Sequence, residues 1–402
     1  MSEGAKEATM GARERMRERY DVVVVGARAA GAATSMLLAR RGLRVLAVDR
    51  GEYGSDTLST HALMRAGVLQ LVRWGLLGRI EREGTPPVNR TVFHYDDGAV
   101  DVPIKPRDGV PALFAPRRTV LDRVLVDAAV EAGAEVRHRV RLADLLRGAG
   151  GRVEGVLLQE ADGEMSAVRA DFVVGADGLR STVAALVDAP VTWRARHAAA
   201  AVYGYWSGLD VDGYHWYWGP GAAAGAIPTN GGQVLLFASV SERECRETMH
   251  ADIPRAYRRI VADVAPELAE RLPEAQLAGN LKGFPGHAGF MKRAWGPGWA
   301  LVGDAAYFKD PITAHGISDA LRDAELLASA FVEGGEGALA EYEATRDELS
   351  TRFAEVTDRI ASFEWDTAEL KILHKALSEE MKREVAAIVD RPAPRPVLAH
   401  TA

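Results

Sequence analysis

The sequence predicts an α/β protein in which a parallel-sheet domain is interrupted by an inserted, mostly antiparallel β-sheet domain and followed by C-terminal helices. Three observations support this prediction. Residues 21–49 read as strand, glycine turn, helix and strand, which is a complete βαβ unit. Two further buried-strand runs, FVVGADG at 172–178 and WALVG at 299–303, come much later in the chain. A strand-rich, aromatic stretch at about 191–240 separates them, so we expect the first domain to be discontinuous.

The individual elements follow from hydrophobic periodicity and from turn residues. Gly42 ends the first helix, and Asp97 with Gly98 is a typical hairpin turn. In chain order the patterns predict strands at 21–25 and 45–48, helices at about 29–40, 61–81 and 117–133, hairpins at 91–104 and 152–170, a helix from about Gly316, and helices over 336–390.

These elements define the predicted domain limits. We expect disordered tails at 1–19 and 391–402, a dinucleotide-binding domain at 20–88, 112–188 and 286–335, a substrate domain at 89–111 and 189–285, and C-terminal helices at 336–390.

Composition excludes several classes of protein. The 402 residues are 48% hydrophobic, which is enough for two domains with sizeable cores. A net charge of −7 without a basic stripe argues against nucleic acid as a partner. A single cysteine, Cys245, excludes an internal disulfide and a cysteine zinc site, and no apolar run approaches the ~18 residues of a membrane span. We therefore expect a cytoplasmic protein without a membrane span.

The turn after the first strand resembles a dinucleotide-binding turn with one substitution. Gly26 and Gly31 fill the first and third glycine positions, which serve the tight bend and the packing of helix on strand. Arg28 stands where the second glycine is usual. Its side chain either points away or meets a pyrophosphate beside the positive end of the helix.

Asp49 ends the second strand, where a carboxylate accepts hydrogen bonds from a ribose. The alternative interpretation is a surface acid paired with Arg44 or Arg50.

Two later motifs extend this pattern, VVGADGLRSTV at 173–183 and LVGDAAYFKDPITAHGISDA at 301–320. Together with Gly26 and Gly31, they resemble the three fingerprints of class A flavoprotein monooxygenases, the para-hydroxybenzoate hydroxylase-like superfamily of FAD-dependent oxidoreductases. The resemblance spans nearly the whole chain. It implies a Rossmann-like FAD-binding domain with an inserted substrate domain.

The resemblance also assigns roles to individual residues. Asp177 and Gly178 match the pair near the flavin pyrophosphate and the path of the nicotinamide cofactor, and Gly303 with Asp304 match the pair that binds the ribityl chain. The remaining assignments are Pro311 beside the isoalloxazine, Gly316 at the start of the helix whose dipole favours a reduced flavin, and Arg118, rather than Arg117, at the pyrophosphate.

Several positions depart from the family pattern. Tyr307 stands where GDAAH is common, and Ala314–Ser318 replaces the usual GQGxN. Ala184 replaces the usual arginine after STV, which leaves reduction by a separate flavin reductase open. Lys309 and Asp310 are expected either to be exposed or to line the substrate side.

The inserted domain is rich in aromatic residues. On a strand, Trp216 and Trp218 share one face with Tyr214, and with Tyr205 they offer a wall for a flat apolar substrate over the flavin. The alternative is that these rings only fill the core between sheet and domain.

His61 and His315 are the candidate acid–base residues, because imidazole titrates near neutral pH. The alternative for each is a satisfied structural histidine. We expect no metal, since neither histidine shows metal-ligand spacing to a second ligand.

These predictions combine into an FAD-dependent monooxygenase that hydroxylates or epoxidises a flat, largely apolar small molecule through a flavin hydroperoxide, using NAD(P)H and O₂. The nearest rival is an FAD-dependent reductase or dehydrogenase resembling the geranylgeranyl reductase branch. A flavin halogenase is disfavoured because its WxWxIP element is not reproduced, and a non-catalytic flavin-binding partner is the rival from another class.

Overall fold

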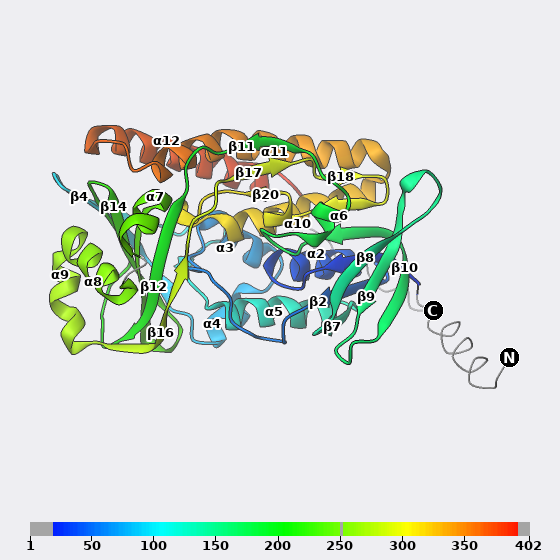
Figure 1. The fold of residues 1–402 in the computed structure, drawn as a ribbon, viewed down its shortest axis with the longest axis horizontal. Helices are drawn as coiled ribbons and strands as arrows, with labels where there is room; N and C mark the ends of the chain where they lie inside the picture. The colour runs from blue at the N-terminus through cyan, green and yellow to red at the C-terminus, as the bar shows by residue number, and fades with distance from the viewer. Residues whose placement is uncertain (1–18, 250–251, 393–402) are drawn as a thin grey trace.

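Two large β-sheets lie side by side and are bridged by a pair of long C-terminal helices (Figure 1). The computed structural model describes residues 19–249 and 252–392. The predicted tails, 1–19 and 391–402, lie outside the described residues, except that Arg19 begins the first strand and that residues 391–392 are described.

The first sheet has eight strands and carries the predicted βαβ unit. Its main order is β18-β19-β10-β1-β2-β7, with β9 and β8 added as a hairpin beside β10. The neighbours β10, β1, β2 and β7 run parallel, and the valine-rich segments of β10, β1 and β2 are buried, as parallel sheets covered on both faces require. The bounds are β1 Arg19–Val25, β2 Val45–Asp49, β7 Glu135–His138, β8 Arg141–Arg147, β9 Val153–Gln159, β10 Met165–Gly175, β18 Trp295–Gly296 and β19 Trp299–Leu301.

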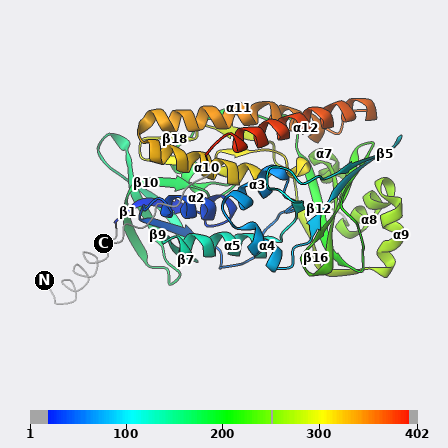
Figure 2. The ribbon, with the colours of Figure 1, turned by 180° about the vertical axis from the view of Figure 1, so that it is seen from behind.

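Helices cover this sheet, and two of them, α2 and α10, begin at the edge where strands β1 and β19 end. Helix α10 packs along α2, and α2 packs against α5 (Figure 2). The bounds are α2 Ala29–Ala39, α3 Arg65–Arg73, α4 Leu77–Arg82, α5 Arg118–Glu131, α6 Thr182–Leu186 and α10 Gly316–Glu333. The single helical stretch expected at 61–81 is wrong, because the chain breaks between α3 and α4 at Gly75, whose φ is +75°.

The second sheet has seven strands in the order β16-β12-β15-β14-β13-β4-β5. Neighbouring strands are antiparallel except β13 and β4. The bounds are β4 Arg90–Tyr95, β5 Gly98–Pro103, β12 Ala199–Ser207, β13 Tyr214–Gly219, β14 Ala222–Thr229, β15 Gln233–Ser241 and β16 Gln276–Phe284. The strands come from the two predicted substrate segments, although the exact domain limits stay predictions.

The two faces of this second sheet belong to different cores, as the alternation along β13 predicts. Tyr214, Trp216 and Trp218 face the flavin-motif domain and the C-terminal helices, whereas Tyr217 faces α8 (Ile253–Val264). The small helices α7 (Glu242–Glu244) and α9 (Pro266–Arg271) complete the cover of the outer side.

Helices α11 (Gly335–Ala361) and α12 (Thr367–Val389) connect the two sheets (Figures 1 and 2). Residues near the start of α11 and the end of α12 join the core of the first sheet, for example Tyr342 and Ile388. Residues near the loop between them, such as Phe353 and Leu370, join the core of the second sheet. The long apolar seams of these helices are thus buried within the same chain.

Short elements complete the fold. A three-stranded sheet joins the two domains in the order β11-β17-β20, and a two-stranded ribbon pairs β3 with β6. Their bounds are β3 Pro87–Val88, β6 Leu113–Phe114, β11 Val191–Arg194, β17 Phe290–Lys292 and β20 Tyr307–Phe308. Among the described helices none combines the length and apolar character needed to span a bilayer.

Candidate functional site

The three sequence motifs converge where β1, β10 and β19 end. A Cβ on Gly31 would lie 1.7 Å from the Gly26 carbonyl oxygen, and a Cβ on Gly26, whose φ is +100°, would lie 2.3 Å from the Ala176 carbonyl oxygen. Gly303 lies between α2 and α10, with Ala30 and Ala320 as its nearest contacts. Glycine is therefore required at these positions for close backbone packing, which brings the ends of α2 and α10 together.

The N-terminus of α2 carries an excess of positive charge. Arg28 donates to Asp122 Oδ2 at 3.0 Å and also to Ser55, and Arg118 bonds the same carboxylate through both Nε and a terminal nitrogen. Two guanidinium groups thus share one carboxylate. The side chain of the N-cap residue does not cap the helix, so its first amides stay available to an anion such as a diphosphate. Arg118 is largely buried in this ion pair, and its contact with the pyrophosphate stays a prediction.

Asp49 lies beside this helix end. Its carboxylate accepts from the Ala27 amide at 2.8 Å and from the Gly51 amide at 2.7 Å, and it is buried rather than paired with a surface arginine. A small pocket adjoins it, and in this pocket both ring nitrogens of His138 are buried without a hydrogen-bond partner. The pocket is lined by Ala27, Arg28, Asp49, Glu52, Gly54, Ser55, Asp122, Val126 and His138.

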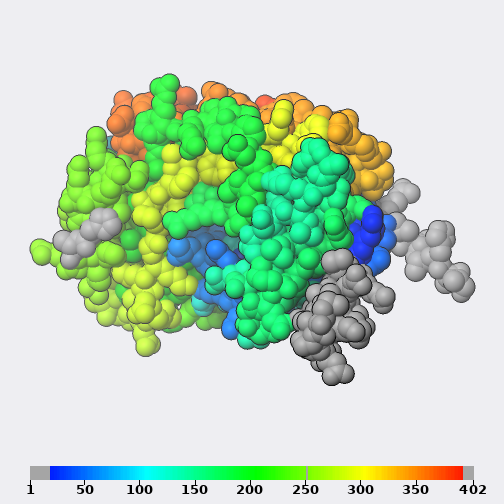
Figure 3. All heavy atoms as spheres, turned by 45° about the vertical axis from the view of Figure 1, so that its right-hand side comes forward, coloured from blue at the N-terminus to red at the C-terminus, as the bar shows by residue number. Residues whose placement is uncertain are grey.

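A wider groove continues from the same strand end. It has a volume of about 470 Å³ and is lined by Arg50, Glu52, Arg139 and Arg141, among others. In the space-filling view the blue segment that follows β2 is recessed between the yellow-green part of the sheet domain and the teal β8–β9 hairpin (Figure 3). Pocket and groove together offer space for the adenosine end of a dinucleotide.

Asp304 lies against the start of α10. A Cβ on Gly316 would be 3.8 Å from Asp304 Oδ1, and the side chain of the N-cap residue of this helix, His315, does not cap it. Burial raises the pKa of Asp304 to about 7, and the nearby Asp319 adds to the rise. The third motif thus places a titratable carboxyl and free helix amides together, next to the helix end of the first motif.

Asp177 and Gly178 occupy the turn after β10. The Asp177 carboxylate accepts from the Ser181 hydroxyl at 2.5 Å and from the Thr182 amide at 2.6 Å, so it fixes the start of α6. Gly178 has a φ of +79° with open space around it. Their predicted cofactor contacts stay predictions, and the structure adds a local structural role for the aspartate.

The loop before α10 is anchored to the substrate sheet. Asp310 is buried, and its carboxylate accepts from the Ala199 amide at 2.6 Å and from the Ile312 amide at 2.9 Å. Pro311 begins the single helical turn that follows, and Ala314 has a φ of +49°. Of the two alternatives for Lys309 and Asp310, exposure is wrong, because both are buried, and a place on the substrate side stays a prediction.

His61 lies at the junction of the two domains and stacks on Tyr205, with ring centroids 5.8 Å apart and planes inclined by 8°. The two side chains are buried, and within the described part of the chain neither ring nitrogen of His61 nor the Tyr205 hydroxyl has a hydrogen-bond partner of good geometry. Burial lowers the pKa of His61 to about 3, with Arg117 and Arg118 adding to the effect, whereas burial raises the pKa of Tyr205. Arg117 lies 4.0 Å from the centre of the Tyr205 ring.

Trp216 and Trp218 are farther along the same sheet face. Trp216 donates to the Thr91 hydroxyl at 2.8 Å, and Trp218 packs against Trp365 and His374. The structure does not place them in the contact group of His61 and Tyr205. Their observed contacts match the core-filling alternative, and a role in substrate binding stays a prediction.

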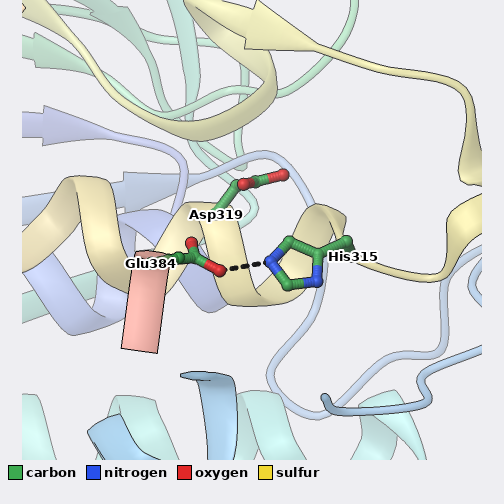
Figure 4. A group of neighbouring side chains, drawn as sticks. All are labelled: His315, Asp319 and Glu384. Atoms are coloured by element: carbon green, nitrogen blue, oxygen red, sulfur yellow. Dashed lines mark hydrogen bonds and ion pairs between the residues drawn. The ribbon is translucent and has the colours of Figure 1, made fainter. Parts of the chain in front are cut away.

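His315 belongs to a different group from His61. Its Nε2 lies 2.5 Å from Glu384 Oε2 (Figure 4). Its ring also packs against Phe353. The argument that neither histidine has a second ligand is wrong for His315, because Asp319 and Glu384 offer atoms within 4.8 Å of one another and of the imidazole. The side chains of Lys309 and Arg322 already pair with these carboxylates.

Sequence reasoning missed several of these polar residues, although some left a signal. Asp122 is four positions after Arg118 on a helix, and Asp319 is four positions after His315, so each pair shares a face. His138 ends β7 in register with Asp49. Glu384 left no signal, since nothing in the sequence relates it to a residue so distant.

The described residues fit FAD. The arginine pair and the free α2 amides suit its diphosphate, the groove of about 470 Å³ that adjoins Asp49 suits its adenosine half, and Asp304 with the α10 amides suits the ribityl chain and flavin ring. Fold and site together define an FAD-dependent oxidoreductase.

Comparison with known proteins agrees with this class. The chain belongs to the FAD binding domain family, whose sequence profile matches residues 19–357. This family and the structural neighbours confirm the resemblance to the para-hydroxybenzoate hydroxylase-like superfamily and the predicted fold class.

A digeranylgeranylglycerophospholipid reductase of Methanothrix thermoacetophila is 28% identical over 385 residues, covering 91% of this chain and 93% of the relative. The flavin-dependent brominase Bmp2 superposes with a TM-score of 0.77 at 20% identity over 94% of this chain and 96% of that chain. The p-nitrophenol 4-monooxygenase PnpA of Pseudomonas putida DLL-E4 gives 0.73 at 19% identity over 92% and 97% of the two chains.

Asp304 gives a first testable prediction. A ribityl hydroxyl donates best to an ionised carboxylate, so FAD should bind more tightly as the pH rises through about 7, the pKa of Asp304. We expect Asp304→Asn to weaken FAD binding about tenfold and to abolish this pH dependence, measured by flavin-fluorescence titration. Asp263→Asn, exposed on α8, is the control. Equal affinity and an unchanged pH profile in Asp304→Asn would contradict the placement of the ribityl chain.

Proposed function

We propose that this flavoprotein is a monooxygenase that hydroxylates or epoxidises a flat, largely apolar small molecule with O₂, taking its electrons from NAD(P)H or from a separate flavin reductase. The observation that carries the proposal is the stacked pair of His61 and Tyr205. It is buried at the junction of the two domains, and among the described residues its polar atoms have no hydrogen-bond partner of good geometry.

FAD, held by Arg28, Arg118, Asp49 and Asp304, would supply the two-electron redox chemistry. The chain's own contribution is a dry, aromatic enclosure and a hydrogen-bond acceptor that orients the substrate. Because burial lowers its pKa to about 3, the imidazole of His61 is neutral near neutral pH and too weak a base to take the proton of a phenol. A ring nitrogen can instead accept a hydrogen bond from the hydroxyl of a bound phenol-like substrate and orient that substrate. The covering helices α11 and α12 keep water away from this junction.

A second candidate is reduction of a carbon–carbon double bond. The whole-length likeness to a digeranylgeranylglycerophospholipid reductase favours it. In this reaction the Tyr205 hydroxyl, which keeps its proton because burial raises its pKa, would donate the proton that accompanies electron transfer to carbon.

The two candidates depend on different members of one stack, His61 as the group that orients the substrate and Tyr205 as a proton donor, which makes them separable by mutation. Under the hydroxylase proposal, His61→Asn lowers kcat about 10²-fold while Tyr205→Phe has a small effect; under the reductase alternative the two effects are exchanged. Asparagine is chosen because His61 has a φ of +43°, a conformation that asparagine tolerates well.

The decisive experiment reacts the reduced, FAD-loaded protein with a panel of planar aromatic compounds and isoprenoid lipids. Incorporation of one atom from isotopically labelled O₂ into a product supports the monooxygenase. Anaerobic reoxidation of the flavin with saturation of a substrate double bond would replace it with the reductase. FAD that is never oxidised productively by any of these compounds would argue for a non-catalytic flavin-binding partner.

A further inference from the structure

A buried ionic cluster occupies the junction of α10, α11 and α12. Arg322 bonds Asp319, Asp323 and Glu384 at 2.8–3.1 Å, and Lys309 pairs with Asp319. These groups are buried, and the Ser350 hydroxyl accepts a further hydrogen bond from Arg322.

Glu384 connects this cluster to the start of α10. Its Oε1 accepts from Arg322 at 2.9 Å, and its Oε2 lies 2.5 Å from His315 Nε2. Burial alone would raise the pKa of Glu384, but His315, Arg322 and Lys309 outweigh it and hold the pKa below its usual range. An ionised carboxylate only accepts hydrogen bonds, so His315 Nε2 must carry a proton and donate it to this bond.

This bond has two consequences for the imidazole. The ring is fixed in orientation, and its other nitrogen, Nδ1, is left buried without a partner. His315 is also the N-cap residue of α10. The next residue, Gly316, lies close to Asp304 Oδ1. Glu384 thus acts through the side chain of His315 on the N-terminus of α10, the helix end that fits the flavin.

A metal ion is a poorer explanation of the same group. His315, Asp319 and Glu384 lie close enough to bind one. However, Lys309 and Arg322 already supply positive charge to both carboxylates, so a divalent cation would meet two competing cations.

We propose that Glu384 is a positioning residue of the flavin site, holding His315 so that α12 sets the electrostatic environment at the start of α10. The inference rests on the placement of the flavin at this helix end. The family match ends at residue 357, so Glu384 comes from outside the matched region. It follows that α12 is part of the cofactor site and not only a cover.

The test is the midpoint potential of the bound FAD. Glu384→Gln removes a buried negative charge while Lys309 and Arg322 stay, so the surplus positive charge should stabilise reduced flavin and move the potential to a more positive value. Glu384→Asp, which keeps the charge, should move it less. Glu379→Gln, exposed on the same helix, should leave it unchanged and serves as the matched control.

His315→Gln approaches the same bond from the other side and provides a second measurement if Glu384→Gln folds poorly. Because the two residues act through one contact, the shift of the double variant should differ from the sum of the single shifts. Additive shifts, or a potential in Glu384→Gln that is unchanged or more negative, would overturn the proposal. If Asp304→Asn also leaves FAD binding intact, the placement of the flavin is at fault rather than the role of Glu384.

Discussion

Gly31→Ala is expected to prevent FAD binding and to lower the free energy of unfolding by about 3 kcal/mol. Alanine in a helix is ordinarily more stable than glycine by about 0.5–1 kcal/mol, so propensity alone predicts a gain. The added Cβ, however, would lie 1.7 Å from the Gly26 carbonyl oxygen, and backbone atoms cannot rotate away as a side chain can. Relief requires α2 to move off the turn, which displaces the amides that fit the diphosphate.

Flavin content after purification and urea unfolding together check this result. Gly337→Ala is the matched control, because Gly337 is also helical and a Cβ there meets nothing within 4 Å. We expect it to retain FAD and to lose no stability. A fully flavin-loaded, stable Gly31→Ala protein would show that α2 tolerates displacement and that the tight turn is not needed.

Arg322→Met is expected to cost about 3–5 kcal/mol near neutral pH, the range for removing one partner of a buried ionic network. Arg322 is 2% exposed and is the common partner of three buried carboxylates. Methionine fills much of the volume but leaves those carboxylates without their main counter-charge.

The pH dependence of this loss has a definite sign. In the native protein the pKa of Glu384 is lowered, so its contribution is present above its ordinary pKa of 4.5 and is lost as the pH falls. Without Arg322 the buried carboxylates of the folded protein prefer to be protonated. This preference lowers the free energy of unfolding only at pH values where the same carboxylates are ionised in the unfolded chain. The difference between variant and native protein should therefore shrink from neutral pH toward about pH 4.

Urea unfolding at both pH values tests this, with Arg383→Met as the control. Arg383 lies on the exposed side of α12, and its ion pairs with Glu348 and Glu380 are at the surface, so we expect a change below about 0.5 kcal/mol. A loss in Arg322→Met that is the same at both pH values would point to packing rather than charge as its cause.

The candidate site was predictable where local sequence dictates backbone geometry. Gly26 and Gly31 are readable because a tight turn and a close helix contact admit no Cβ, and Asp49 is readable because it ends a buried strand. The alternation of Tyr214, Trp216 and Trp218 predicted their shared face correctly. That alternation could not show whether these rings form a substrate-binding wall or fill the core, because the answer depends on which elements pack against this face of the sheet.

Longer-range partners were beyond the sequence for a physical reason. Arg28 meets Asp122 and His315 meets Glu384 across separations of 94 and 69 residues, and no periodicity encodes such a pairing. The expectation of an exposed Lys309 failed for the same cause, since a charged side chain is buried only when a distant fold element brings it a partner.

The sequence by itself determined the order of elements, the class of fold and the FAD-binding motifs, because glycine turns, buried-strand runs and strand-end carboxylates act within a few residues of the chain. Only the tertiary structure decided which charged side chains pair with one another. It also decided that His61 stacks on the substrate sheet and that His315 is held by α12. Burial, and with it the pKa of each group, is a property of everything packed around a side chain, and that packing is set by elements hundreds of residues apart.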